Sequence, residues 1–466
     1  MQKNSKRMAF RCSSCDHEES RWLGRCPECG EWNTLIETVS SSGKGGVSLI
    51  VDGKPPLSLP LSAIDSSERV HVSSGIAELD RVLGGGLMKR SSILLGGEPG
   101  IGKSTLLLQV AASVRTDGII LYISGEESAG QLRMRADRLD IMDPARGAGR
   151  IETLCTGSLA KIETVLNARR PVLVIVDSAQ TLHADDAGPA PGTVNQMKFC
   201  AWELVSWVKE HDATLFLVAH VTKEGFISGP KTLEHMVDTV LYFEQNSIDS
   251  RFLRASKNRF GSIDEIGIFM MTEKGLVAVD DLSSLFLVRR EGELPPGVST
   301  AAVMEGSRTL LVEIQALTVP AKGAMSRVFS DKIDGARVAR IAATMEKHLN
   351  LRLSDQDLYV NVAGGIRISE VGVDLALAAA LYSARANIPL PRGTVVAGEL
   401  SLAGEVRPLR RLSTRVKTSM SIGFDRFVGP EESESQAEKK MSSADIFQIR
   451  DIKSAIKAIW SPTLKT

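Results

Sequence analysis

The sequence predicts an α/β fold, and three observations lead to that prediction. Four short, nearly continuous apolar runs end at Gly97, Ser124, Asp177 and His220, as expected of parallel strands buried on both faces. Helix-like stretches alternate with these runs between about residues 61 and 285. A glycine-rich segment also joins the first run to the helix-like stretch after it.

Composition sets limits on the whole chain. The 466 residues suffice for two or three domains, and 56 Lys plus Arg balance 56 Asp plus Glu. Any contact with nucleic acid must therefore depend on local basic loops. No apolar run approaches ~18 residues and no apolar run follows the basic start, so we expect neither a membrane span nor a secretory signal. Six cysteines in so long a chain indicate a reducing compartment, the cytoplasm.

The N-terminal segment 1–37 carries a cysteine pattern typical of a zinc ribbon. Two C-x2-C pairs are separated by ten residues, and each pair places two thiolates on one tight turn. Trp22 and Trp32 provide a small core. Four ligands leave no open position, so the predicted Zn²⁺ is structural. The predicted ligands are Cys12, Cys15, Cys26 and Cys29. Cys155 and Cys200 are isolated, and we expect both to be buried.

Composition also divides the rest of the chain. Residues 38–60 are rich in Ser, Gly and Pro and read as a flexible linker. Residues 61–288 hold the α/β pattern described above. After Pro and Gly punctuation near residue 295, residues 289–466 alternate strands with an Ala- and Leu-rich helix, as expected of a separate α+β domain.

The segment GEPGIGKST matches G-x-x-x-x-G-K-[ST] in the required strand–loop–helix context. Its glycines let backbone amides face phosphates, and Lys103 supplies charge to the β and γ phosphates of ATP. Ser104 is predicted to bind Mg²⁺. The predicted nucleotide-binding residues here are Gly97, Glu98, Pro99, Gly100, Ile101, Gly102, Lys103, Ser104 and Thr105.

Carboxylates follow two of the apolar runs. Asp177 ends a buried strand, where it can hold Mg²⁺ or its water, or else cap the next helix. Glu126 and Glu127 follow the strand after the glycine-rich loop. A carboxylate there can orient the water that attacks the γ-phosphate, and position favours Glu126. Either glutamate can instead be a carboxylate in the first turn of the next helix, where it interacts favourably with the helix dipole.

Polar and basic residues follow the later strands. His220 can sense the γ-phosphate or simply cap its strand. The segment 221–235 mixes lysines, glycines and Phe226, which suits single-stranded nucleic acid. In KNRFG, Lys257 and Arg259 point the same way on an extended segment. They can reach a phosphate on DNA or on a neighbour's ATP, or form a basic turn.

Together these motifs resemble the RadA (Sms) family of bacterial DNA-repair proteins. The cysteine ribbon, SGIAELDRVLGGGL, GEPGIGKST, SGEES and KNRFG occur in that family's order over essentially the whole chain. The resemblance implies a RecA-like ATPase core, hexameric rings, and ATP-driven branch migration alongside RecA on single-stranded and branched DNA. It also gives Lys257 and Arg259 a role at the neighbouring subunit's nucleotide.

The C-terminal region is similar to the Lon protease domain. In that fold a serine and a lysine form the catalytic dyad, and the matching positions here hold Gly372 and Ser413. The resemblance therefore implies the fold without peptidase chemistry, since Ser369 nearby has no base. Basic residues there can face DNA or solvent: Arg327, Lys332, Arg337, Arg340, Arg407, Arg410 and Arg411.

The sequence thus predicts a RecA-like P-loop ATPase core with a C4 zinc ribbon before it and a Lon-protease-like domain after it. Two functions remain open: a DNA-dependent ATPase motor, or an ATP-switched assembly protein that does not translocate. An ATP-dependent protease is disfavoured by the missing dyad.

Overall fold

A computed structural model shows two compact units, Met1–Glu68 and Arg69–Thr466. It describes residues 8–12, 17–19, 24, 26–30, 35–39, 71–142, 148–188, 193–220, 232–245, 250–279, 283–288, 290–323, 326–431 and 445–461. Nearly all of the predicted linker 38–60 lies outside these residues. Across the described residues, no helix is long and apolar enough to cross a membrane.

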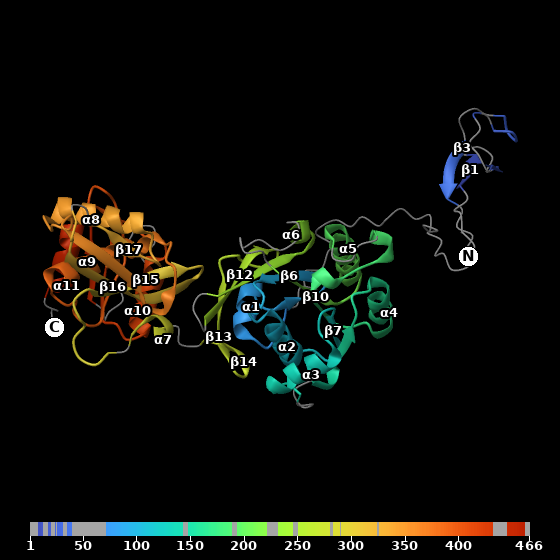
Figure 1. The fold of residues 1–466 in the computed structure, drawn as a ribbon, viewed down its shortest axis with the longest axis horizontal. Coiled ribbons are helices and arrows are strands. Elements are labelled where there is room, and N and C mark those ends of the chain that lie inside the picture. The colour runs from blue at the N-terminus through green and yellow to red at the C-terminus, as the bar shows by residue number, and fades with distance from the viewer. Residues whose placement is uncertain are drawn as a thin grey trace. The chain divides into compact units, whose positions relative to one another are not determined.

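The first unit contains a small antiparallel sheet of order β2-β1-β3. Its strands are β1 (Met8–Cys12), β2 (Glu18–Glu19) and β3 (Leu35–Val39). The first predicted ligand, Cys12, is the last residue of β1. Figure 1 shows β1 beside β3 in blue.

The first half of the second unit is built on a nine-stranded sheet of order β14-β13-β12-β11-β6-β10-β9-β7-β8. Neighbours from β11 to β8 run parallel, and the other end of the sheet is antiparallel. The strands are β6 (Ser91–Gly97), β7 (Ile120–Ser124), β8 (Ile151–Cys155), β9 (Leu173–Asp177), β10 (Thr214–His220), β11 (Thr239–Gln245), β12 (Ser250–Asn258), β13 (Ile266–Thr272) and β14 (Gly275–Ala278). A short hairpin of β4 (His71–Val72) and β5 (Leu87–Met88) precedes them.

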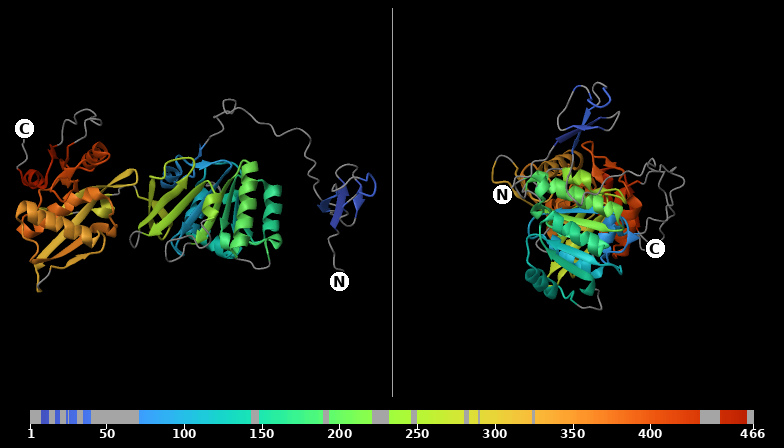
Figure 2. Two further views of the ribbon diagram at one scale, coloured as in Figure 1. Left: turned by 90° about the horizontal axis from the view of Figure 1, so that it is seen from above. Right: turned by 90° about the vertical axis from the view of Figure 1, so that its right-hand side faces the viewer.

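Helices bury both faces of this sheet, as the layers in Figure 2 show. One face packs on α1 (Ala77–Leu83), α2 (Lys103–Ser113) and α3 (Ala129–Arg138). The other packs on α4 (Leu159–Arg169), α5 (Val194–Glu210) and α6 (Thr232–Met236). Alternate residues of a strand therefore enter different cores: Ile93 and Leu95 on one side, Leu94 on the other. This double burial explains the continuous apolar runs.

The second half of this unit is an α+β domain on a seven-stranded sheet of order β17-β18-β16-β15-β19-β22-β23. Its strands are β15 (Val298–Glu305), β16 (Arg308–Pro320), β17 (Val328–Ser330), β18 (Gln356–Val362), β19 (Thr394–Val396), β22 (Arg426–Pro430) and β23 (Asp445–Ile449), with a hairpin of β20 (Glu399–Leu400) and β21 (Val406–Arg407). Its helices are α7 (Ser283–Phe286), α8 (Gly335–Leu349), α9 (Asp374–Ala386), α10 (Leu412–Ser421) and α11 (Ile452–Trp460).

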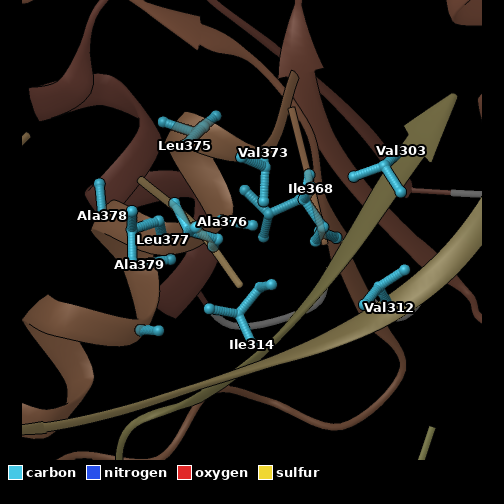
Figure 3. Packing of buried hydrophobic residues seen from close by; sticks show 14 of the residues in the cluster. Val303, Val312, Ile314, Ile368, Val373, Leu375, Ala376, Leu377, Ala378 and Ala379 are labelled. Carbon is cyan, nitrogen blue, oxygen red and sulfur yellow. The ribbon is translucent and has the colours of Figure 1, made fainter. Parts of the chain in front are cut away.

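Helix α9 is the centre of this domain's core. Its residues from Leu375 to Leu381 are fully buried. Figure 3 shows Val303 of β15 and Val312 and Ile314 of β16 across from this part of α9, and all of these residues belong to one cluster. The Ala-rich composition of α9 lets the helix lie close to the sheet, and this is the Ala- and Leu-rich helix that the sequence predicts.

The four predicted strands are confirmed as β6, β7, β9 and β10, and the fold class is confirmed. Two burial predictions are wrong. Cys155 is exposed, because β8 is the edge strand of its sheet. Arg337 is 8% exposed rather than on a solvated face, because it pairs with buried Asp374 at 2.9 Å. Cys200 is buried in α5, and burial raises its pKa to about 11.

Candidate nucleotide site

The glycine-rich loop joins the central strand β6 to α2. Gly100 and Gly102 have φ of 77° and 115°, which only glycine adopts readily. A Cβ added to Gly102 would also lie 2.7 Å from the Met271 side chain, whereas a Cβ added to Gly100 would meet nothing within 4 Å. The first amides of α2 have no partner within the helix, so the loop directs donors at one point. That arrangement suits an anion such as the phosphates of a nucleotide.

Lys103 begins α2 and lies 5% exposed beneath the loop. Its Nζ donates to the carbonyl oxygens of Gly97 at 2.7 Å and Glu98 at 2.9 Å. Burial lowers the pKa of Lys103 to about 8, although Asp177 and Glu126 raise it in part. A buried ammonium with flexible carbonyl partners can transfer to the stronger acceptors that phosphate oxygens provide.

Asp177 lies beside the end of β7, which leads to Glu126, because β9 and β7 are parallel neighbours. The register pairs Ser124 with Asp177, so the carboxyl ends of both strands meet at one edge. The hydroxyl of Tyr122 donates to Asp177 Oδ2 at 2.7 Å. Burial, reinforced by Asp177, raises the pKa of Tyr122 well above its usual value. Tyr122 is therefore a fixed donor that orients one oxygen of the carboxylate.

The two adjacent glutamates have different environments. Glu126 accepts a hydrogen bond from Ser178 Oγ at 2.6 Å, and its Oε1 lies 3.6 Å from His220 Nε2. His220 Nδ1 in turn lies 3.5 Å from Lys103 Nζ. Glu127 instead forms an ion pair with Arg135 of α3. One histidine, His220, thus lies between the Glu126 carboxylate and Lys103, while Glu127 is paired with an arginine.

These groups line one cleft of about 390 Å³. Of the predicted residues, the cleft contains Gly100, Gly102, Lys103, Ser104, Thr105, Glu126, Glu127, Asp177 and His220. Gly97, Glu98, Pro99 and Ile101 shape the loop but do not line the cleft; Ile101 is 3% exposed and packs into the core. Ser104 and Asp177 bring hydroxyl and carboxylate oxygens to the same cleft, which is the donor set that Mg²⁺ takes beside phosphates.

Several residues of the cleft escape prediction from sequence. Arg135 and Arg138 reach it from α3, and Tyr122 and Ser178 orient its carboxylates. One signal was available for the arginines: Ser128 and Gln131 form a capping box that starts α3. Side chains of a helix tilt toward its N-terminus, so long arginine side chains of α3 can reach back toward the end of β7.

KNRFG lies near the end of the sheet where β6 starts, whereas the glycine-rich loop follows the end of β6. Lys257 Nζ donates to the carbonyl oxygens of Glu234 at 2.8 Å and Val237 at 2.6 Å, at the end of α6. Arg259 pairs with Asp238 at 3.0 Å and is 55% exposed. Neither side chain joins the cleft that holds Lys103. Of the segment 221–235, predicted to meet nucleic acid, residues 221–231 lie outside the described residues.

The described part of the zinc ribbon fits a metal-binding turn. Residues 27–29 form a turn in which Gly30 N donates to Cys26 O at 3.0 Å, with Gly30 at φ 73°. Such a knuckle brings the Cys26 and Cys29 thiols to one side, as a tetrahedral site requires. Cys15 and the side chain of Cys12 lie outside the described residues.

At the place of the Lon dyad, the domain holds an ion pair. Arg415, 2% exposed, donates to Glu370 Oε1 at 2.9 Å and to Ala302 O at 2.6 Å. A Cβ on Gly372 would lie 2.7 Å from both Glu370 carboxylate oxygens and 3.0 Å from Arg415. The space that a nucleophilic serine needs is therefore filled by this pair.

Comparisons with known proteins agree with this architecture. The family model described as "AAA domain" matches residues 60–225, "Rubredoxin metal binding domain" matches 10–37, and "Subunit ChlI of Mg-chelatase" matches 332–433. The fold and the cleft thus define an ATPase of the P-loop class with an N-terminal metal-binding ribbon, which implies nucleotide and zinc binding.

The relatives identify the family. The chain is 56% identical to the DNA repair protein RadA of Treponema pallidum, over 92% of this chain and 93% of that one. It is 44% identical to RadA of Brucella abortus, over 90% of each chain, and 43% identical to RadA of Bacillus subtilis, over 90% and 92%. The chain belongs to the RadA family of DNA repair proteins.

Proposed function

We propose that this protein is a DNA-dependent ATPase that processes recombination intermediates, promoting branch migration in a helicase-like manner alongside RecA. The main support is the row Lys103–His220–Glu126, with gaps of 3.5 and 3.6 Å. His220 is the last residue of β10 and directly precedes the segment whose composition suits single-stranded DNA. A change at the γ-phosphate can therefore reach the DNA-binding segment through one side chain.

The chemistry assigns a separate task to each group. Backbone amides of residues 97–105 cradle the phosphates, and Lys103 balances charge on the β and γ groups. Ser104 and Asp177 hold Mg²⁺, which neutralises the developing charge when it is bound. Glu126 orients the water and takes its proton as the water oxygen bonds to the γ-phosphorus; the bond from that phosphorus to the ADP oxygen breaks, and ADP and inorganic phosphate are the products. Ser178 and His220 keep that carboxylate directed at the cleft.

The rest of the proposal concerns organisation. We propose a zinc ribbon at 1–37 with Cys12, Cys15, Cys26 and Cys29 as ligands, a linker at 38–60, an ATPase domain at 61–288 and a Lon-protease-like domain at 289–466 without peptidase activity. The working form is a hexameric ring on single-stranded or branched DNA. Of the KNRFG pair, Arg259 acts between subunits, and Lys257 supports it from within its own subunit by donating to the carbonyl groups at the end of α6. The cysteine usage fits the cytoplasm.

One experiment separates a motor from a nucleotide switch. ATP turnover is measured without DNA, with single-stranded DNA and with forked DNA, and strand displacement is followed on the fork. A motor shows DNA-stimulated turnover and displacement, and Lys103→Ala removes both. Turnover that DNA leaves unchanged, with no displacement, contradicts the motor and supports an ATP-switched assembly protein.

A further inference from the structure

An exposed apolar row crosses three strands of the C-terminal sheet. In the register of β17, β18 and β16, Phe329 lies opposite Tyr359, and Tyr359 lies opposite Leu317. Paired residues share a face of the sheet. These three are 43%, 38% and 57% exposed, whereas their chain neighbours Leu358, Val360 and Ala316 are buried. This aromatic row (Leu317, Tyr359 and Phe329) therefore faces solvent, and the domain core does not account for it.

The planar groups of the row are already aligned. The rings of Phe329 and Tyr359 are stacked, with centroids 4.6 Å apart and an angle of 9° between the ring planes. The Arg327 guanidinium lies 5.5 Å from the Phe329 centroid, and its Nη2 donates to Asp357 Oδ2 at 2.6 Å. The ion pair fixes the guanidinium over the ring. A further planar group could extend this stack with little loss of side-chain freedom.

The edge of the row offers hydrogen-bonding groups. Gln315 and Asn361 are paired two residues beyond Leu317 and Tyr359, and Asn361 Nδ2 donates to Gln315 Oε1 at 3.1 Å. With Asp331 they line a hollow of about 360 Å³ that also contains the aromatic row. Amides provide both donors and acceptors, which match the edges of a nucleobase. The hollow thus combines stacking surface with polar edges.

We propose that the aromatic row binds unpaired bases of single-stranded DNA; the choice of DNA rests on the function proposed above. Around the row, Arg327 is paired with Asp357 and Arg290 with Glu313, whose neighbour on the same face is Gln315, and Asp331 adds a further carboxylate. Net charge therefore does not draw the phosphate backbone to this face, and the contact is to bases. Exposed aromatic side chains on a sheet are a recurrent platform for such stacking.

The test compares binding of bases with binding of backbone. Fluorescence anisotropy gives the affinity of the full-length protein for a labelled oligothymidylate and for an abasic strand of equal length. The parent should prefer the strand with bases by roughly tenfold or more, as expected for stacked bases. The double variant Phe329→Ala/Tyr359→Ala should lose most of that preference for bases, while any contact made by residues 221–235 is unchanged. The factor by which the double variant loses affinity for the strand with bases should be the same at low and high salt, because no phosphate contact is removed.

Matched controls keep the result specific. Tyr359→Phe retains the ring and should behave as the parent. The proposal is overturned if the double variant keeps the parent's preference for bases, or if it loses affinity equally for the abasic strand. It is also overturned if sedimentation shows altered assembly, which would make the row a subunit contact. DNA-stimulated ATP turnover by the parent, measured in parallel, tests the proposed function separately.

Discussion

At the scale of single residues, the cleft distinguishes two adjacent glutamates that the sequence leaves as alternatives. Glu126 contacts Ser178 and lies near His220, whose other ring nitrogen lies 3.5 Å from Lys103 Nζ. Glu127 is tied to Arg135, and its backbone amide donates to Ser124 Oγ at 2.9 Å. A carboxylate neutralised by a guanidinium is a poor base for water, so the environment favours Glu126 for that role.

The glutamates can be separated by matched amide substitutions. Glu126→Gln should lower the turnover number about 100-fold or more while ATP binding is retained, since only the water-activating step is removed. Glu127→Gln should have a much smaller effect on turnover. Single-turnover hydrolysis and equilibrium binding of labelled ATP give the two quantities. Larger damage from Glu127→Gln than from Glu126→Gln would reassign the base.

Lys103 should make ATP binding depend on pH. Its pKa of about 8 means that the free protein loses this charge as the pH rises past 8. Phosphates favour the ammonium form, so binding takes up a proton, and ATP affinity falls above that pH. Calorimetry in two buffers of different ionisation enthalpy should show little proton uptake at pH 7 and most of one proton at pH 8.5.

Lys103→Arg is the control for that titration, because a guanidinium stays protonated over the same range. The variant should bind ATP without proton uptake, whatever its affinity. Equal uptake by the parent and by Lys103→Arg would mean that another group titrates.

At the scale of elements, the zinc ribbon should unfold independently. Cys29→Ser removes a ligand from the turn closed by the Gly30–Cys26 hydrogen bond. Since metal binding and folding are coupled in such ribbons, the variant should lose zinc while ATP turnover without DNA is unchanged. Elemental analysis and turnover give the two readouts. Zinc missing from the parent, purified without chelators, would contradict the site.

The Lon-like element should not accept a serine at its former nucleophile position. Gly372→Ser places a Cβ against the Glu370 carboxylate, which must then shift away from the Gly372 amide and the buried Arg415 guanidinium that it contacts. Overpacking of this kind costs roughly 1–3 kcal/mol, so the domain should melt at a lower temperature. Ser369→Ala, outside that contact, should leave the melting temperature unchanged. Normal stability of Gly372→Ser would contradict the steric argument. Peptide cleavage by this variant would contradict the absence of a peptidase function.

These elements also show what can be predicted from sequence. The strands β6, β7, β9 and β10 are predictable because burial on both faces leaves continuous apolar runs. The meeting of Asp177 with Glu126 follows from parallel strands ending at one edge. The ion pair of Arg135 depends on how α3 packs, and the aromatic row on the register of β16, β18 and β17. Long-range pairing of this kind leaves no local pattern in the chain.

At the scale of the whole molecule, Arg259 of KNRFG lies far from the phosphate loop of its own subunit. Arg259 pairs with Asp238, whose Oδ2 accepts from Ser92 N at the start of β6, whereas the phosphate loop begins where β6 ends. Five residues of strand separate the two points by roughly 17 Å. Arg259 therefore cannot serve its own subunit's phosphates, and any contact with ATP must be made across a subunit boundary.

Mixed rings test that contact. Glu126→Gln subunits cannot hydrolyse ATP but keep Arg259, while Arg259→Ala subunits keep Glu126 but donate no guanidinium. Where the first donates to the second, one site regains every group, so mixing the two inactive proteins should restore part of the turnover. Arg259→Lys should be defective despite its charge, because lysine cannot bind two phosphate oxygens in a fork.

Lys257 provides the control for the mixed rings. Its ammonium caps the carbonyl end of α6 within its own subunit, so the defect of Lys257→Met should be corrected less than that of Arg259→Ala. Subunit exchange is confirmed by labelled protomers before turnover is measured. If KNRFG contacts DNA instead, Arg259→Ala alone hydrolyses ATP at the parent's DNA-free rate and loses only its stimulation by DNA. That result would exclude the contact between subunits, because a site deprived of a transition-state guanidinium cannot keep its full basal rate.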